Sequence, residues 1–234
     1  MRAYGSGVNL HYNLDSLVAQ VQRWVNAGFD AVKVKVGKPD VVEDLERLEA
    51  VRAVLGPDRQ LMIDANQRWD LDRATRSMDV LAGAAPAWIE EPLRADDLAG
   101  HSELARRLAS SSGVPIAVGE NLHTAYRFGE FLAAGAAQIV QPNIVRVGGI
   151  TPFLRIVALT AEHGSALHPH LLPELSGQLA LTLPTVEALP APLVEDVEDA
   201  AFGDLGALTD PSPVTIAAGS LTESAHVGLG LRFR

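Results

Sequence analysis

Short apolar runs that suit β-strands recur along this 234-residue chain at intervals of 23 to 29 residues, and they constrain its fold more than any other feature. Amphipathic segments with apolar residues at helical spacing separate them. The interval is the length of one strand–helix unit, and regular alternation of such units predicts a parallel sheet. A leucine-rich solenoid has a similar period, but its ladder of asparagine and leucine is absent.

Eight strands and seven helices are predicted. The strands are Ala3–Asn9, Ala31–Gly37, Gln60–Asn66, Ala87–Pro92, Pro115–Asn121, Gln138–Asn143, Ser165–His170 and Pro192–Val197. The helices are Asp15–Ala27, Pro39–Leu55, Leu71–Gly83, Asp97–Ser111, Thr124–Ala134, Thr151–His163 and Glu174–Leu189. Eight strands favour a closed barrel of the TIM type, for which ~250 residues is typical. An open doubly wound sheet is the alternative, but the glycine-rich phosphate turn usual after an early strand is absent.

The eighth unit lacks a helix, so residues 1–200 are predicted to form a (β/α)7β barrel. The stretch after Val197 is rich in glycine, proline and aspartate, and only Val214–Ala217 resembles a strand. Residues 201–234 are therefore expected to be a C-terminal extension that packs outside the barrel.

Composition excludes several classes of function. The chain has no cysteine, which excludes disulfides and thiolate chemistry and favours the cytoplasm. The net charge of −10 argues against nucleic acids and anionic membranes as partners, because both require a basic surface. We expect no leader peptide, because the first residues contain no apolar segment.

The second strand carries two lysines, Lys33 and Lys35, on one face. Such alternation is normal for a half-exposed strand, but both faces of a barrel strand are covered. Burial and mutual repulsion would lower the pKa of a lysine toward the range of a general base.

Three acids end three successive strands, and they predict a metal site. Asp64, Glu90 and Glu120 each follow an apolar run, and only one of the neighbours Glu90 and Glu91 can point inward. Singly, each acid is typical of a helix cap or a surface charge. Together they would converge above the barrel, where Mg²⁺, or Mn²⁺ in its place, would relieve their repulsion.

Other polar residues end the remaining strands at the same edge. They are Asn66, Asn143, His168, His170 and Glu195. A lone histidine is most often structural, but His168 and His170 share a face by the period of two. Asn66 likewise shares a face with Asp64.

The motifs that carry these residues resemble the mandelate racemase and muconate-lactonizing branch of the enolase superfamily. They are Lys33-Val34-Lys35, Ile63-Asp64-Ala65-Asn66, Trp88-Ile89-Glu90-Glu91-Pro92, Val118-Gly119-Glu120-Asn121 and Val147-Gly148-Gly149-Ile150-Thr151. They stand in the family's order on the corresponding strands and span nearly the whole chain.

The resemblance implies a role for each residue. The metal ligands would be Asp64, Glu90 and Glu120; Lys35 would be one acid/base, tuned by Lys33; His170 would be the acid/base on the opposite face; and Glu195 would hydrogen-bond the substrate carboxylate. Asn66 and His168 are placed beside the substrate. The implied reaction removes the proton next to a carboxylate and gives an enediolate held on the metal.

The sequence departs from the family pattern in two places. Relatives with a catalytic histidine orient it with an aspartate, whereas this chain has Asn143, which can orient the ring but supplies no negative charge. The family also has an N-terminal capping domain, whereas this sequence starts at the first barrel strand. We therefore expect weak turnover from this chain, a C-terminal extension that would pack on such a cap, and an exposed surface that favours a homo-oligomer.

The expected function is Mg²⁺-dependent dehydration of a small carboxylate, an acid sugar. A lysine on one face and a histidine able to protonate a leaving hydroxyl favour elimination over racemisation. A racemase, an epimerase or a cycloisomerase of the same superfamily is the alternative, and so is a truncated barrel that binds metal but is catalytically weak.

Overall fold

The computed structural model describes residues 1–183, 190–223 and 225–234, and its central feature is a curled sheet of eight strands. The strands are β1 (Ala3–Ser6), β2 (Ala31–Lys35), β3 (Gln60–Asp64), β4 (Ile89–Glu90), β5 (Ile116–Val118), β6 (Ile139–Val140), β7 (Ala166–Leu167) and β8 (Val194–Val197). Neighbours follow the order β7-β6-β5-β4-β3-β2-β1-β8, and all pairs are parallel. The eight predicted strands are confirmed, but most end earlier than predicted, so several of the polar residues after them lie in loops.

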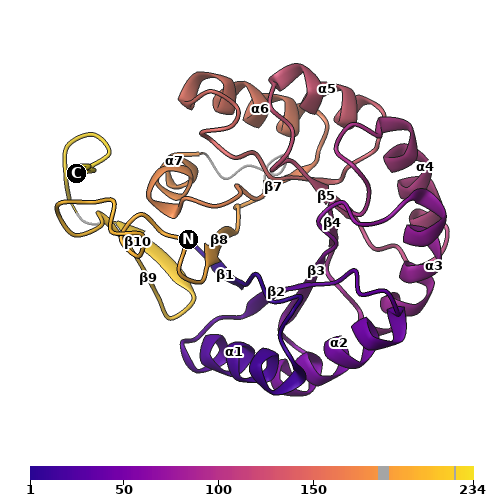
Figure 1. Ribbon diagram of the computed structural model, residues 1–234. Coiled ribbons are helices and arrows are strands. Elements are labelled where there is room, and N and C mark those ends of the chain that lie inside the picture. Colours follow the sequence, from indigo (N-terminus) through magenta and orange to yellow (C-terminus); the bar gives the residue numbers. More distant parts are fainter. Residues whose placement is uncertain (184–189, 224) are drawn as a thin grey trace.

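Six helices surround the sheet on its outer side (Figure 1). They are α1 (Leu14–Asn26), α2 (Val41–Leu55), α3 (Leu71–Leu81), α4 (Leu98–Ala109), α5 (Ala125–Ala133) and α6 (Ile150–Glu162), with a short 3-10 turn η1 (Ala82–Ala84) after α3. The first five begin at side chains that accept a backbone N–H of the first turn, namely Asn13, Asp40, Asp70, Asp97 and Thr124. Such caps satisfy otherwise unpaired donors and stabilise a helix by about 1 kcal/mol each.

The seventh helical segment differs from the prediction of one helix over Glu174–Leu189. A π-helix, η2 (Pro173–Gly177), is followed by a short α-helix, α7 (Gln178–Leu181). The Ser176 hydroxyl hydrogen-bonds to the backbone carbonyls of Leu171 and Leu172, which directly precede the π-helix. A side chain thus binds carbonyls near the start of this segment. Residues 184–189 of the predicted helix lie outside the described part of the chain.

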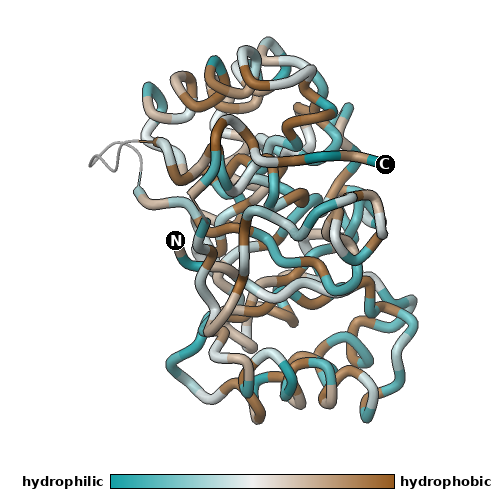
Figure 2. Tube along the Cα trace, turned by 90° about the vertical axis from the view of Figure 1, so that its left-hand side faces the viewer, coloured by the Kyte–Doolittle hydropathy of each residue, from teal (hydrophilic) through white to brown (hydrophobic). Residues whose placement is uncertain are grey.

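Among the described residues, two hydrophobic clusters line the two faces of the sheet. The larger lies between the sheet and the helices, and along the outer helices hydrophobic and hydrophilic residues alternate, as Figure 2 shows. The smaller comprises Tyr4, Ala31, Met62, Trp88, Ala117, Ile139 and Leu193. Several of these share a strand face with Lys33, Asp64 and Glu90, so an apolar layer underlies the polar one inside the curl.

The sheet has a seam between β7 and β8, which stand at opposite ends of the strand order. Side chains bridge it: His168 Nδ1 accepts a hydrogen bond from Leu193 N at 3.0 Å, and Glu195 Oε2 accepts one from Leu171 N at 3.1 Å. The His168 ring also stacks on Trp88 with 5.2 Å between the ring centroids. His168, which we expected beside the substrate, is thus buried at the seam.

His168 makes the fold sensitive to acid. Burial lowers its pKa to about 4, so between pH 6.5 and 4 the unfolded chain binds a proton that the folded chain does not, and stability falls as the pH falls. H168Q keeps an acceptor for Leu193 N without titrating. Between pH 7.5 and 4.5, urea unfolding should show wild type losing about 2–3 kcal/mol more than H168Q. The control H163Q changes an exposed histidine, so its free energy of unfolding should depend on pH as that of wild type does. The same pH dependence in wild type and H168Q would refute this account.

The C-terminal extension contains an antiparallel hairpin of β9 (Val214–Ala217) and β10 (Ser220–Glu223). Leu221 exchanges two backbone hydrogen bonds with Met1, and its side chain is buried with Val194 and Val214. The strand expected at Val214–Ala217 is therefore confirmed, and it lies in a hairpin beside β1. Packing of the extension on a capping domain stays a prediction. No helix in the described part of the chain is long and apolar enough to cross a membrane.

Candidate active site

Lys33 is the centre of a buried cluster of carboxylates at the carboxyl ends of the strands. Its Nζ lies 2.7 Å from Glu90, 2.7 Å from Glu195 and 3.8 Å from Asp64. The side chains of Lys33, Glu90 and Glu195 are each only 1% exposed, so water does not screen these ion pairs. Gln141, for which we predicted no role, donates to Glu90 Oε2 at 2.7 Å.

The structure corrects the expectation that the pKa of a buried lysine is lowered here. Burial by itself lowers the pKa of Lys33, but the charges of Glu195 and Glu90 outweigh it and hold that pKa well above its usual value. Conversely, burial alone would raise the pKa of Glu195, but Lys33 and His170 hold it well below its usual range. Lys33 is therefore a fixed cation rather than a group poised to lose its proton.

Lys35 lies on the same face of β2 as Lys33, as predicted, but nearer the solvent. Its Nζ is 2.5 Å from Asp64 Oδ2, and its side chain is 13% exposed. Parallel pairing explains the contact, because Lys35 stands opposite Asp64 in the register of β2 and β3. Asn66, an exposed residue, donates its backbone N–H to Asp64 Oδ1 at 2.8 Å and its side-chain Nδ2 to Asp64 Oδ2 at 3.3 Å.

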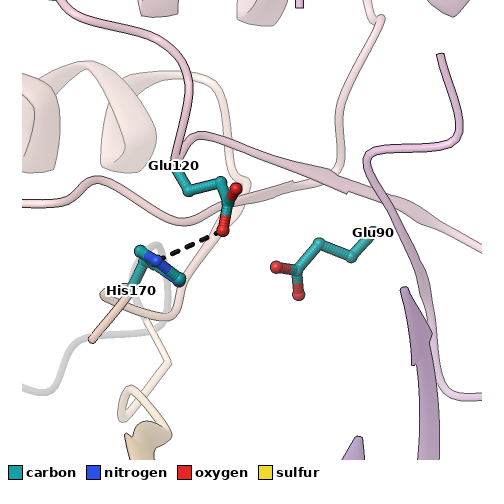
Figure 3. A group of neighbouring side chains, drawn as sticks. All are labelled: Glu90, Glu120 and His170. Carbon is teal, nitrogen blue, oxygen red and sulfur yellow. Dashed lines mark ion pairs between the residues drawn. The ribbon is translucent and has the colours of Figure 1, made fainter. Parts of the chain in front are cut away.

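Glu90, Glu120 and His170 point toward one another (Figure 3), and one ligand atom from each lies within 4.8 Å of the others. His170 Nε2 is 3.2 Å from Glu120 Oε2. The turn that places Glu120 requires a glycine, because Gly119 has φ +152° and a Cβ there would lie 2.6 Å from the Gln141 backbone. Asp64, predicted with Glu90 and Glu120, is adjacent to this group through its contact with Lys33.

The partner of His170 is Glu195. His170 Nδ1 lies 2.7 Å from Glu195 Oε2. Burial lowers the pKa of His170, but Glu195 and Glu120 outweigh it and raise that pKa above its usual value. Asn143, expected to orient this ring, instead accepts the backbone N–H groups of Val145 and Arg146 with its Oδ1, because an asparagine side chain readily caps its own loop. A carboxylate from β8 thus supplies the negative charge that Asn143 lacks.

Both glutamates of the Glu90-Glu91 pair are buried. Glu91 turns away from Lys33 and accepts hydrogen bonds from Asn121 and Gln67. Burial and the nearby Glu120 raise its pKa to about 8, against the opposing effect of the Asn121 hydrogen bond. The sequence argument that only one of the pair points into the cluster is confirmed, but the burial of Glu91 was not anticipated.

The crowding of acids in the cluster fits a divalent cation. Four acids, Asp64, Glu90, Glu120 and Glu195, meet two lysines and a histidine. Burial and the nearby Asp64 and Glu195 raise the pKa of Glu90 to about 7, against the opposing charge of Lys33. Oxygen donors are the ligands that Mg²⁺ and Mn²⁺ prefer. The donor set of this cluster therefore suits such an ion.

A curled parallel sheet with acids at the carboxyl ends of its strands is the arrangement of α/β-barrel enzymes. Residues 16–234 match the enolase C-terminal domain-like family. The chain is 44% identical over 180 residues to L-talarate/galactarate dehydratase of Salmonella typhimurium, covering 76% of this chain and 44% of the relative. It is 36% identical over 231 residues to 3,6-anhydro-alpha-L-galactonate cycloisomerase of Streptomyces coelicolor, covering 98% and 60%.

A solved structure of a related dehydratase is also similar to this chain. The crystal structure of L-talarate dehydratase from Polaromonas sp. JS666 with Mg and L-glucarate superposes with a TM-score of 0.86 at 36% identity, covering 100% of this chain and 59% of that one. The chain belongs to the enolase C-terminal domain-like family, within the mandelate racemase and muconate-lactonizing branch that its motifs resemble. It spans 60% or less of the length of these three relatives.

Proposed function

We propose that this chain is the (β/α)7β catalytic barrel of a Mg²⁺-dependent acid-sugar dehydratase. One observation carries the proposal: a cationic side chain stands at each end of a row of three strand-end carboxylates. Lys35 contacts Asp64 at one end, and His170 contacts Glu120 at the other. A substrate above the row would have a nitrogen base on one side and an acid on the other.

Asp64, Glu90 and Glu120 are the ligands that we assign to the cation. His170 lies within reach of Glu90 and Glu120, but Glu195 and Glu120 favour its protonated form, and a protonated imidazole cannot ligate a metal. Asp64 supplies the third oxygen donor, which requires that it leave Lys35. When bound, the cation stabilises the negative charge that develops on the substrate carboxylate.

The side chains then divide the proton transfers between them. Lys35, once it has left Asp64 and lost its own proton to solvent, accepts the α-proton of the substrate as a neutral amine. The C–O bond to the neighbouring hydroxyl breaks, and the proton of His170 leaves with that hydroxyl as water. Glu195 holds the His170 ring from β8, and Lys33 pairs with Glu90 and Glu195 and keeps both carboxyl groups in place.

The substrate class is a small sugar acid. Two relatives support this class: one is named L-talarate/galactarate dehydratase, and the other, L-talarate dehydratase, was solved with bound L-glucarate. The cycloisomerase relative favours the alternative of an isomerase. Incubation with galactarate in D₂O separates the two, because a dehydratase forms a keto acid, whereas an isomerase forms an isomer or exchanges the α-proton without net loss of water.

The metal assignment predicts one binding site. Calorimetry with Mn²⁺ should show a single site in the wild-type chain, and D64N should weaken it by more than ~100-fold, the upper end of the loss for an outer-shell partner. D58N removes an exposed carboxylate on a loop and should bind like wild type. Unchanged affinity in D64N would remove Asp64 from the ligand set, and no binding in wild type would defeat the proposed function.

A further inference from the structure

Glu91 has no part in the proposed chemistry, yet it is 2% exposed and surrounded by donors. Asn121 Nδ2 lies 3.0 and 2.8 Å from its two carboxylate oxygens, and Gln67 Nε2 donates to Oε2 at 3.0 Å. Two side-chain amides thus converge on one buried carboxyl group. These hydrogen bonds satisfy the buried carboxyl group.

Asn121 connects Glu91 to the metal site. Its Nδ2 also donates to Glu120 Oε1 at 2.9 Å. Its Oδ1 accepts from Arg146 Nη1 at 3.0 Å, and the same Nη1 donates to the Glu120 carbonyl at 2.8 Å. Because a guanidinium is only a donor, Arg146 fixes which end of the amide is oxygen, and Nδ2 must face Glu91 and Glu120.

These contacts link the loops after four neighbouring strands. Gln67 follows β3, Glu91 follows β4, Asn121 follows β5 and Arg146 follows β6. Gln67 is held in turn by the N–H of Ala95 at 2.9 Å. The Glu120 side chain, 15% exposed at the rim of the cluster, is thereby connected through Asn121 to the buried Glu91.

We propose that Glu91 is a positioning residue that acts through Asn121 to hold the Glu120 carboxylate in the orientation a divalent cation requires. The inference rests on the proposed metal site but concerns residues outside its ligand set. Orientation of a ligating carboxylate by its own hydrogen-bond partners changes metal affinity without any contact with the ion.

The test is Mn²⁺ affinity at fixed pH in a double-mutant cycle. The affinities are compared above pH 8, where Glu91 is ionised and offers two acceptor oxygens. E91Q offers only one, so its amide N–H₂ would face a donor of Asn121 or Gln67. We expect E91Q to weaken binding by about 10-fold, within the 10–100-fold range of outer-shell changes. N121A should weaken it at least as much. E91Q/N121A should be no weaker than N121A, because the effect of Glu91 passes through Asn121.

Rescue and controls sharpen the result. Q67E/E91Q exchanges acceptor and donor across the 3.0 Å contact and should recover most of the lost affinity. E46Q makes the same change on the exposed side of α2 and should bind like wild type. Wild-type affinity in E91Q, or an equal loss in the N121A background, would overturn the inference. If E91Q does not fold, unchanged affinity in N121A would overturn it, whereas absence of binding in wild type would count against the metal site itself.

Discussion

Replacing Lys35 with methionine should reduce exchange of the substrate α-proton with solvent by ~10²–10⁴-fold, the usual contribution of a general base. Methionine keeps the length of the side chain but cannot accept a proton. Mn²⁺ binding should persist and even strengthen, because Asp64 no longer forms its 2.5 Å ion pair with Lys35. The measurement is loss of the α-proton of galactarate in D₂O, followed by NMR as keto acid formed together with deuterium incorporated, with Mn²⁺ calorimetry on the same samples.

The matched control is K38M. Lys38 pairs with Glu43 on the surface at 2.8 Å, so its loss should change neither exchange nor metal binding. If K35M exchanges the proton at the wild-type rate, Lys35 is not the base. If K33M abolishes exchange while retaining its fold and its metal, the two lysines have the opposite roles.

The second large effect is on stability. K33M should lower the free energy of unfolding by ~3–5 kcal/mol, because removing one partner of a buried ion pair leaves uncompensated charges. Here two carboxylates, Glu90 and Glu195, lose a cation at 2.7 Å while staying buried. Urea unfolding at neutral pH without metal measures the loss. K35M should lower the free energy of unfolding far less, because Asp64 keeps its contacts with Lys33 and Asn66.

Metal should partly compensate for K33M. A divalent cation near Glu90 replaces some of the missing positive charge, so saturating Mn²⁺ should stabilise K33M by more than it stabilises wild type. Equal stability of K33M and K35M without metal would show that the ion pairs of Lys33 are not structurally important and would contradict its placement at the centre of the cluster.

Much of this fold was predictable because a βα repeat leaves a regular period in the sequence. Strand alternation also predicted that Lys33 and Lys35 share a face and that only one of Glu90 and Glu91 points toward the cluster, and the family resemblance selected Glu90. These are local properties, since successive side chains of a strand point to opposite sides. The ends of parallel strands meet at one edge, so a convergence of acids could be expected before any contact was known.

The partners within the site were not predictable, because they depend on distant residues and on how many charges meet. The pKa of Lys33 is raised because β4 and β8 each bring a carboxylate to it, whereas strand pattern alone suggested a lowered value. His170 is paired with Glu195 across the seam, and Asn143 caps its own loop. His168 shares a face with His170 by periodicity, yet the open seam gives it a backbone partner in Leu193.

The account depends most directly on which side chains bind the cation. A crystal of this chain soaked in Mn²⁺ and measured at a wavelength where Mn²⁺ scatters anomalously would show it. We predict one peak bonded to oxygens of Asp64, Glu90 and Glu120, with Lys35 released from Asp64 and His170 still paired with Glu195. A peak bonded to His170, or no peak among these carboxylates at saturating Mn²⁺, would contradict the account.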